Sequence, residues 1–357
     1  MALEPNEQKT SRIEDMVETS RYHSFDAMKG LMILIIVMHH SLFVKGMHHG
    51  YLAVDMFFWI AGVFLMRTIM KKEQTAVHYT YRRLQKVFLP YLLSFGLAAV
   101  LDYKHLMSFT NFDSFMDVYV PFASFLTLTE EMGPPLHSYV ILVGGWFLSV
   151  MIIGGFLLFS ILEYNRKLAT KVLLPLAFIL GYSFMFQINP EVDNFSKLAC
   201  ISFPLLRGFL GMSGGAMVYA LSSNYPELLN KNGRLINLGA ASAFVLFLCI
   251  MFTQKSFDAQ LVLLIPLILL GMLISDSWAE KCYRRIPYGG VLSWLGEISL
   301  EIFLIHSPVI HIVHSCFKNL PVAVAPALYV LADVLAVIAA AFLLHRICCK
   351  WFLSRQK

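Results

Sequence analysis

The sequence predicts an all-α polytopic membrane protein with about ten transmembrane helices and both termini in the cytoplasm. Composition points to a membrane class, because 58% of the residues are hydrophobic and only 14% are charged. Soluble domains are nearer 45–50% apolar and about 25% charged. A net charge of +5 needs no nucleic acid partner, since basic residues gather in cytoplasmic loops.

Apolar runs of about 20 residues, enough to cross roughly 30 Å of hydrocarbon, occur ten times. They cover about 27–44, 51–70, 84–101, 140–162, 170–188, 198–222, 234–253, 258–276, 289–314 and 322–347. We therefore expect a cytoplasmic N-terminal segment (1–26), one membrane domain (27–347) and a cytoplasmic tail (348–357). Residues 102–139 mix acidic and aromatic side chains, which favours an interfacial or re-entrant element.

Lysine and arginine residues orient these runs. With a cytoplasmic N-terminus, 20 of the 28 basic residues fall on the cytoplasmic side when those at the inner ends of runs are included, five fall outside, and the remaining three, Lys29, Arg67 and Arg207, are counted within runs. Such a bias is typical of cytoplasmic loops and predicts ten spans with both ends inside. We expect a multi-pass protein of the cell (plasma) membrane, in contact with membrane lipids, and the sequence indicates no oligomeric state.

Ionisable residues are embedded in several runs, where charge is costly and by default marks function. His40 lies eleven residues beyond Lys29, or roughly 16 Å at 1.5 Å per residue, which places it in the outer half. Asp55 begins the second run, which descends from the outer surface, and His306 lies far along the ninth. We therefore expect His40, Asp55 and His306 to meet at one outer level.

A second polar group is predicted at the inner mouth. Lys29, Arg82, Arg83 and Lys86 lie there, and guanidinium and ammonium groups bind phosphates well. The alternative is ordinary cytoplasmic positive charge without a ligand.

Two carboxylates, Glu297 and Glu301, are four residues apart in the ninth run and are expected on one helix face. They either hold a proton or pair with Arg207.

Four segments carry a family pattern. FDAMKGLMILIIVMHH keeps a basic residue, ten residues and a histidine, here Lys29 and His40, and AVDMFFWIAGVFL has Asp55 at an acidic position. YRRLQKVFLPY contains Arg83 where the pattern begins an Arg-x-x-Arg pair, and LGEISLEIFLIHSPVI contains His306. In this order they resemble the acyltransferase-3 family of integral membrane O-acyltransferases, whose members typically have ten helices.

The resemblance implies transfer of an acyl group, most simply acetyl, from cytoplasmic acyl-CoA to a hydroxyl of a cell-surface glycan or glycolipid. Acyl-CoA is then a co-substrate, and no tightly bound cofactor is expected. His40 is expected as the base that removes the hydroxyl proton, with Asp55 orienting either His40 or a substrate hydroxyl. His306 is expected to bind the acceptor or to stabilise the oxyanion. Lys29, Arg83 and Lys86 are expected to bind the phosphates of CoA, with Arg207, Glu297 and Glu301 in support.

Other interpretations remain open at this point. His39, His40, His48 and His49 form a possible zinc site, but adjacent helical residues point about 100° apart, so no metal is predicted. His40 and His306 are alternatively packed polar side chains, and Asp55 a helix cap. A proton-coupled transporter or lipid-linked glycan exporter is the rival function, although no inverted repeat is visible.

Overall fold

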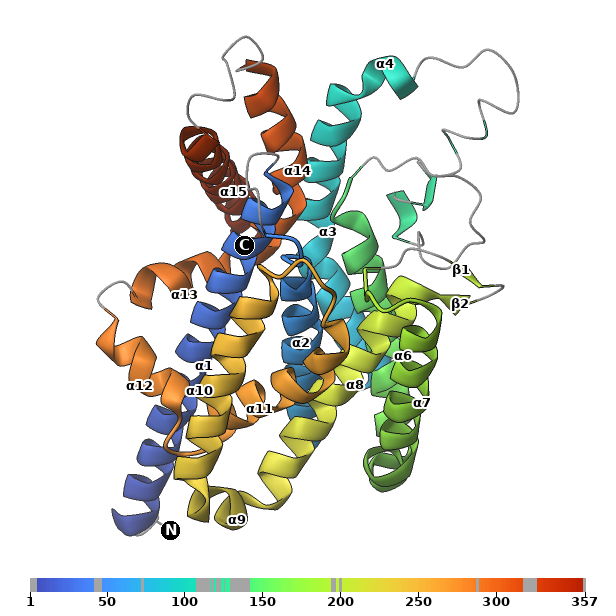
Figure 1. The fold of residues 1–357 in the computed structure, drawn as a ribbon. Helices are drawn as coiled ribbons and strands as arrows, with labels where there is room; N and C mark the ends of the chain where they lie inside the picture. The colour runs from blue at the N-terminus through green and yellow to red at the C-terminus, as the bar shows by residue number, and fades with distance from the viewer. Residues whose placement is uncertain are drawn as a thin grey trace.

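The computed structural model describes residues 5–41, 47–71, 74–106, 142–193, 197–198, 201–286, 289–316 and 326–355, together with 116, 119, 123–124 and 126–128. Helices dominate these residues, and the only strands among them are β1 (Lys197–Leu198) and β2 (Ile201–Ser202), an antiparallel pair (Figure 1). The helices are α1 (Pro5–His40), α2 (Leu52–Met70), α3 (Ala76–Leu101), α4 (Tyr103–Leu106), α6 (Gly145–Leu168), α7 (Leu174–Ile188), α8 (Phe203–Asn224), α9 (Pro226–Lys231), α10 (Gly233–Ile250), α11 (Leu261–Leu273), α12 (Trp278–Arg285), α13 (Gly289–Glu297), α14 (Ser299–Cys316) and α15 (Pro326–Arg355). A π-helical turn, η1 (Ala169–Leu173), precedes α7, and a 3-10 turn, η2 (Asp258–Gln260), precedes α11.

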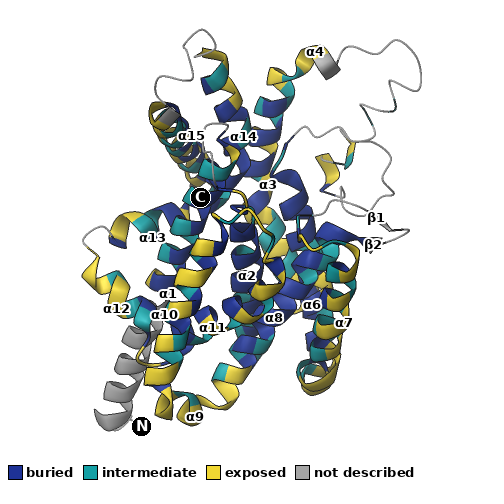
Figure 2. Ribbon diagram, in the orientation of Figure 1, coloured by how far each residue is buried: buried dark blue, intermediate teal, exposed yellow. Residues whose placement is uncertain are grey.

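The helices have membrane character. Within the described ranges, six are long and apolar enough to cross a bilayer, with α6 to α7 counted as one, and the α11–α12 pair, bent by 71°, makes a seventh. Large apolar side chains stay exposed on the outer faces of α7 and α15, among them Leu176, Ile179, Leu343 and Ile347 (Figure 2). Such faces suit contact with lipid tails. The expected ten spans stay a prediction.

The boundary expected between the fourth and fifth runs coincides with a break at Asn165. Its backbone leaves helical geometry, with φ −151° and ψ 88°, and its side-chain Oδ1 accepts a hydrogen bond of 3.0 Å from the amide of Leu168. Asparagine favours this capping geometry because its short amide satisfies an amide at the start of a helix. A new helical segment therefore begins at Asn165.

The ninth run, predicted as one span, is two helices. α13 ends at Glu297 and α14 begins at Ser299, whose hydroxyl bonds the carbonyl oxygen of Gly296 at 2.8 Å. In Figure 1, α14 stands upright while α13 runs across towards α12. The expectation that His306 lies far along one continuous ninth run is therefore wrong, because its helix starts at Ser299.

Glycines let two helix pairs approach backbone to backbone. A Cβ added to Gly62 of α2 would overlap the carbonyl oxygen of Met212 in α8, and one on Gly215 of α8 would overlap that of Trp59. Gly30 of α1 meets α13 in the same way. These contacts agree with the packing role of small residues between membrane helices.

The structure also bears on two segments predicted to lie outside the apolar runs, the N-terminal segment and residues 102–139. α1 begins at Pro5 and runs unbroken past residue 27, so the predicted N-terminal segment continues helically into the first run. Most of the segment 102–139, predicted to be interfacial, lies outside the described residues, and α4 is its first part.

Candidate functional site

Two histidines from opposite ends of the chain meet. His40 ends α1, His306 lies in α14, and their ring centroids are 4.9 Å apart. His306 is buried, with 1% of its surface exposed, whereas His40 is exposed. The structure thus joins two of the three predicted catalytic residues.

A hydrogen bond to the backbone determines which ring nitrogen of His306 carries the proton. Its Nδ1 lies 2.6 Å from the carbonyl oxygen of Phe303, which only accepts, so Nδ1 carries the proton. In the neutral ring Nε2 then presents a lone pair, and this buried atom has no hydrogen-bond partner among the described residues. This geometry favours proton acceptance by His306 over oxyanion stabilisation, which requires a donor.

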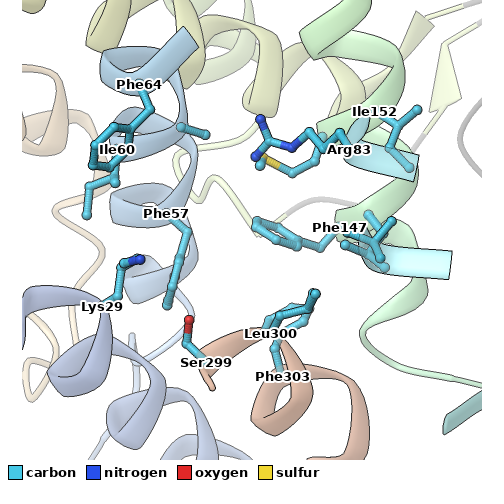
Figure 3. Close-up of a pocket in the computed structure, with 14 residues that line it drawn as sticks. Lys29, Phe57, Ile60, Phe64, Arg83, Phe147, Ile152, Ser299, Leu300 and Phe303 are labelled. Carbon is cyan, nitrogen blue, oxygen red and sulfur yellow. The ribbon is translucent and has the colours of Figure 1, made fainter. Parts of the chain in front are cut away.

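A cavity of about 230 Å³, here called the inner cavity, ends at the helix that carries His306. Its walls come from α1, α2, α3, α6 and α14, and Figure 3 shows Lys29 and Arg83 on opposite sides of it. The lining residues are Lys29, Phe57, Ile60, Ala61, Phe64, Arg83, Val87, Phe147, Leu148, Met151, Ile152, Ser299, Leu300 and Phe303. Two cations and the hydroxyl-bearing Ser299 in a wall that is apolar elsewhere suit an anion joined to an apolar chain.

Phe303 links the inner cavity to the histidine pair. Its ring lines the cavity and lies 5.8 Å from the ring of His306, centroid to centroid. Phe147 packs against Phe303 with centroids 4.8 Å apart. These aromatic rings stand between the cavity and the imidazoles.

The predicted phosphate ligands separate into two groups. Lys29 and Arg83 line the inner cavity, whereas Lys86 is exposed and is not part of its lining. Lys29 forms an ion pair with Asp26 at 2.5 Å, and the guanidinium of Arg83 donates to the hydroxyl of Tyr79. Both cations are thus held in place by a neighbour on their own helix.

A second, more polar pocket of about 750 Å³, here called the helix-end pocket, lies where α6 ends and α3 begins. It is lined by Ile69, Gln74, Thr75, Phe159, Leu162, Glu163, Tyr164, Asn165, Arg166 and Lys167. Tyr79 lies between the two cavities, because its ring stacks on Phe159 at 4.8 Å while its hydroxyl holds Arg83. Sequence reasoning treated Arg166 and Lys167 as ordinary loop charge.

Asp55, the third predicted catalytic residue, binds Arg207 instead of His40. Arg207 donates from Nε to Oδ1 at 3.0 Å and from a terminal nitrogen to Oδ2 at 2.6 Å, and both side chains are 2% exposed. It also donates to the backbone oxygen of Tyr51 and to Asp193. Within the described chain His40 has no hydrogen bond to Asp55, and this paired carboxylate joins α2 to α8.

The other histidines of the first segment have separate surroundings. Nδ1 of His39 donates to the carbonyl of Met47 at 3.1 Å, and His48 is exposed. His49 is buried and bonds the Tyr51 hydroxyl at 2.8 Å, which in turn donates to Asp258 at 2.9 Å. Across the described residues, no group of three or more His, Cys, Asp or Glu side chains is arranged to hold a metal ion.

The two glutamates expected on one helix face are divided by the break at Ile298. Glu297 ends α13 and is exposed, whereas Glu301 lies in α14 and is buried. Glu301 accepts a hydrogen bond of 2.8 Å from Nδ1 of His345 in α15. Pairing of these glutamates with Arg207, one of the sequence alternatives, is wrong because Arg207 is bound to Asp55.

One buried carboxylate near the histidine pair was not among the residues predicted from the sequence. Asp333 of α15 is fully buried, accepts a hydrogen bond of 2.6 Å from Ser41, the neighbour of His40, and lies 3.2 Å from Nε2 of His314. The signal was present, because Asp333 is the sole acid in the last apolar run and acids within such runs mark function or pairing.

Taken together, the described helices and the site define a membrane protein with a cavity that carries two cations and is lined at one end by Phe303, beside a buried histidine. A family model described as an acyltransferase domain matches residues 22–346, nearly the whole chain. The chain therefore belongs to the acyltransferase-3 family, as the four segments indicated. No curated protein and no solved structure matches it significantly.

Proposed function

We propose that this protein transfers an acyl group, most simply acetyl, from cytoplasmic acyl-CoA to a hydroxyl of a cell-surface glycan or glycolipid. The observation that carries the proposal is the continuity from Lys29 and Arg83 through the inner cavity to Phe303, whose carbonyl fixes the proton of His306. Family membership supports acyl transfer, and the cavity supports a donor with an anionic end and an apolar thioester end.

The donor is placed by charge. The thioester arm of acyl-CoA occupies the apolar inner cavity between Lys29 and Arg83. The nucleotide end lies beside Arg83 and Lys86, where Arg166 and Lys167 of the helix-end pocket add further cations. Arginine and lysine bind phosphate oxygens through charge-assisted hydrogen bonds, which are about twice as strong as neutral ones.

Chemistry takes place at the histidine pair. A hydroxyl becomes a good nucleophile when a base removes its proton in the transition state. We assign this step to His40, with the Nε2 lone pair of His306 beside it as a second proton acceptor. The oxygen attacks the thioester carbonyl, the C–S bond breaks, and the imidazolium returns its proton to the CoA thiolate. The products are an ester and free CoA, so atoms and charge balance.

Asp55 serves this centre indirectly. Through its ion pair with Arg207 it holds α2 against α8, and α2 supplies Phe57, Ile60 and Phe64 to the inner cavity. We propose a positioning role for this pair.

The membrane arrangement follows the basic residues. We propose ten spans formed by α1, α2, α3, α6, α7, α8, α10, α11 with α12, α13 with α14, and α15. Both termini then lie in the cytoplasm, and the protein resides in the plasma membrane. The positive-inside bias supports this orientation.

The test uses purified full-length protein in lipid nanodiscs with acetyl-CoA labelled in the acetyl group. Release of free CoA, followed with a thiol reagent, reports the donor reaction, and His40→Ala and His306→Ala are expected to lower it at least a hundredfold. His48→Ala, at an exposed histidine outside the pair, is the matched control and keeps wild-type turnover. Absence of acetyl-CoA binding and CoA release by the wild type would refute the proposal, as would proton-coupled solute uptake without CoA turnover.

A further inference from the structure

A third pocket lies on the seam between α3 and α14, which pack against each other. This seam pocket has a volume of about 240 Å³ and is lined by Ala98, Leu101, Asp102, Ser307, Pro308 and His311. A carboxylate, a hydroxyl and an imidazole thus contribute half of its lining residues. Ligand sites for drug-sized molecules begin near 300 Å³, so this volume suits a single polar ring.

The seam pocket continues the line of the inner cavity. On α3, Arg83 and Val87 line the inner cavity, and Ala98 lies three helical turns beyond Val87 on the same face. On α14, Phe303 lines the inner cavity and Ser307, four residues later, lines the seam pocket. The same two helices therefore wall both spaces in succession.

Two unsatisfied polar atoms lie between the spaces along these helices. Ser94 of α3 is fully buried, and its hydroxyl has no hydrogen-bond partner in the described part of the chain. Nε2 of His306, on α14, is likewise buried and unpartnered. Buried polar atoms in native proteins are nearly always hydrogen-bonded, so a pair of exceptions on facing helices indicates a place where a ligand supplies the partner.

We propose that the seam pocket binds one sugar ring of the acceptor and directs its hydroxyl between Ser94 and His306. Asp102 and Ser307 accept hydrogen bonds from ring hydroxyls at the mouth, and His311 closes one side. The acyl donor arrives from the inner cavity on the same seam, so the two substrates meet at the pair of His40 and His306. This inference rests on the proposed acyl transfer and adds the place where the acceptor ring binds.

The test uses methyl β-D-glucoside as the acceptor probe and labelled acetyl-CoA as donor, with the full chain in nanodiscs. Leu101→Trp places a bulky ring in the seam pocket from a partly exposed position, 37% exposed in the wild type, and is expected to raise the KM for the glucoside at least tenfold. Val100→Trp is the matched control, because the neighbouring Val100 is 68% exposed and is not part of the pocket lining. Its KM for the glucoside stays within twofold of wild type.

A second variant guards against a general loss of structure. Ser94→Ala removes one hydroxyl and is expected to lower kcat for glucoside acetylation about tenfold, with the acetyl-CoA KM within twofold of wild type. Equal effects of Leu101→Trp and Val100→Trp would overturn the inference. So would a wild type that turns over acetyl-CoA but leaves the glucoside unlabelled, a result that spares the proposed donor reaction. A wild type without acetyl-CoA turnover would instead refute the proposed function itself.

Discussion

The ring of His40, at the end of α1, lies 4.9 Å from the ring of His306 in α14. The His40 imidazole is exposed and the His306 imidazole is almost fully buried, so the pair connects the accessible surface with the protein interior. A proton taken up at one ring is therefore within reach of the other, and the two side chains are expected to act as one unit.

The first prediction concerns this unit. His40→Ala and His306→Ala are each expected to reduce acetyl transfer by 10²–10⁴-fold, the usual worth of general acid–base catalysis. The double variant should lose little more than the worse single variant, because residues that act together are strongly non-additive. Steady-state CoA release measures all three. Multiplicative losses would show that the two imidazoles work independently.

The second prediction compares adjacent arginines. Arg83 lines the inner cavity and Arg82, one residue earlier, is exposed and does not. Arg83→Ala is expected to raise the KM for acetyl-CoA about tenfold or more, since hydrogen bonds to charged groups contribute about 1.5–3 kcal/mol. Arg82→Ala should change it less than twofold, as a screened surface charge.

Initial rates at fixed ionic strength, with acetyl-CoA varied, measure both arginine variants. If Arg82→Ala had the larger effect, the donor would have to approach along the outer face of α3 instead of through the inner cavity.

The third prediction concerns the buried ion pair. Asp55→Ala removes the bidentate carboxylate partner of the buried Arg207 guanidinium and leaves it only the longer contact to Asp193, which is expected to cost about 3–5 kcal/mol of stability. The double variant Asp55→Leu with Arg207→Met removes both charges and should recover much of that loss. Thermal unfolding in detergent measures stability, and CoA release by the double variant separates a positioning role from a chemical one. A stable but inactive double variant would point to direct chemistry at Asp55.

The fourth prediction uses the glycines. Gly62→Ala and Gly215→Ala are expected to destabilise the protein by about 1–3 kcal/mol, because each new methyl group meets backbone of the facing helix. Gly155→Ala is the control, since a Cβ there meets no atom within 4 Å. Melting temperatures of the three variants, measured side by side, give the comparison. Equal melting temperatures would exclude close packing of α2 on α8.

The sequence was sufficient for the all-helical class and the family, whereas the ten spans and the roles of the site residues stay predictions. The first and last family segments pointed to His40 and His306, whose rings the structure places 4.9 Å apart, whereas Asp55, expected at the same level, binds Arg207. The apolar runs also located most helices, because a run of apolar residues long enough to cross the bilayer has few alternatives to a membrane helix.

The features that the sequence did not predict have physical causes. The break at Ile298 contains no proline, and the apolar pattern continues on both sides of it. Hydropathy alone therefore predicts one helix. The partner of Asp55 lies 152 residues away on α8 and depends on how closely glycines allow α2 and α8 to approach. The role of Phe303 depends on its carbonyl oxygen, which every residue possesses and no sequence pattern marks.

The close contact between α2 and α8 also bears on how the acceptor range of such a protein can diversify. The seam pocket is built from α3 and α14, so neither of its walls belongs to α2 or α8, the two helices that meet at Gly62 and Gly215. Substitutions at Ala98, Leu101 or His311 can therefore accumulate without loosening the central framework. Under the proposed function, such substitutions would change which acceptor fits the seam pocket while the residues that line the inner cavity stay the same.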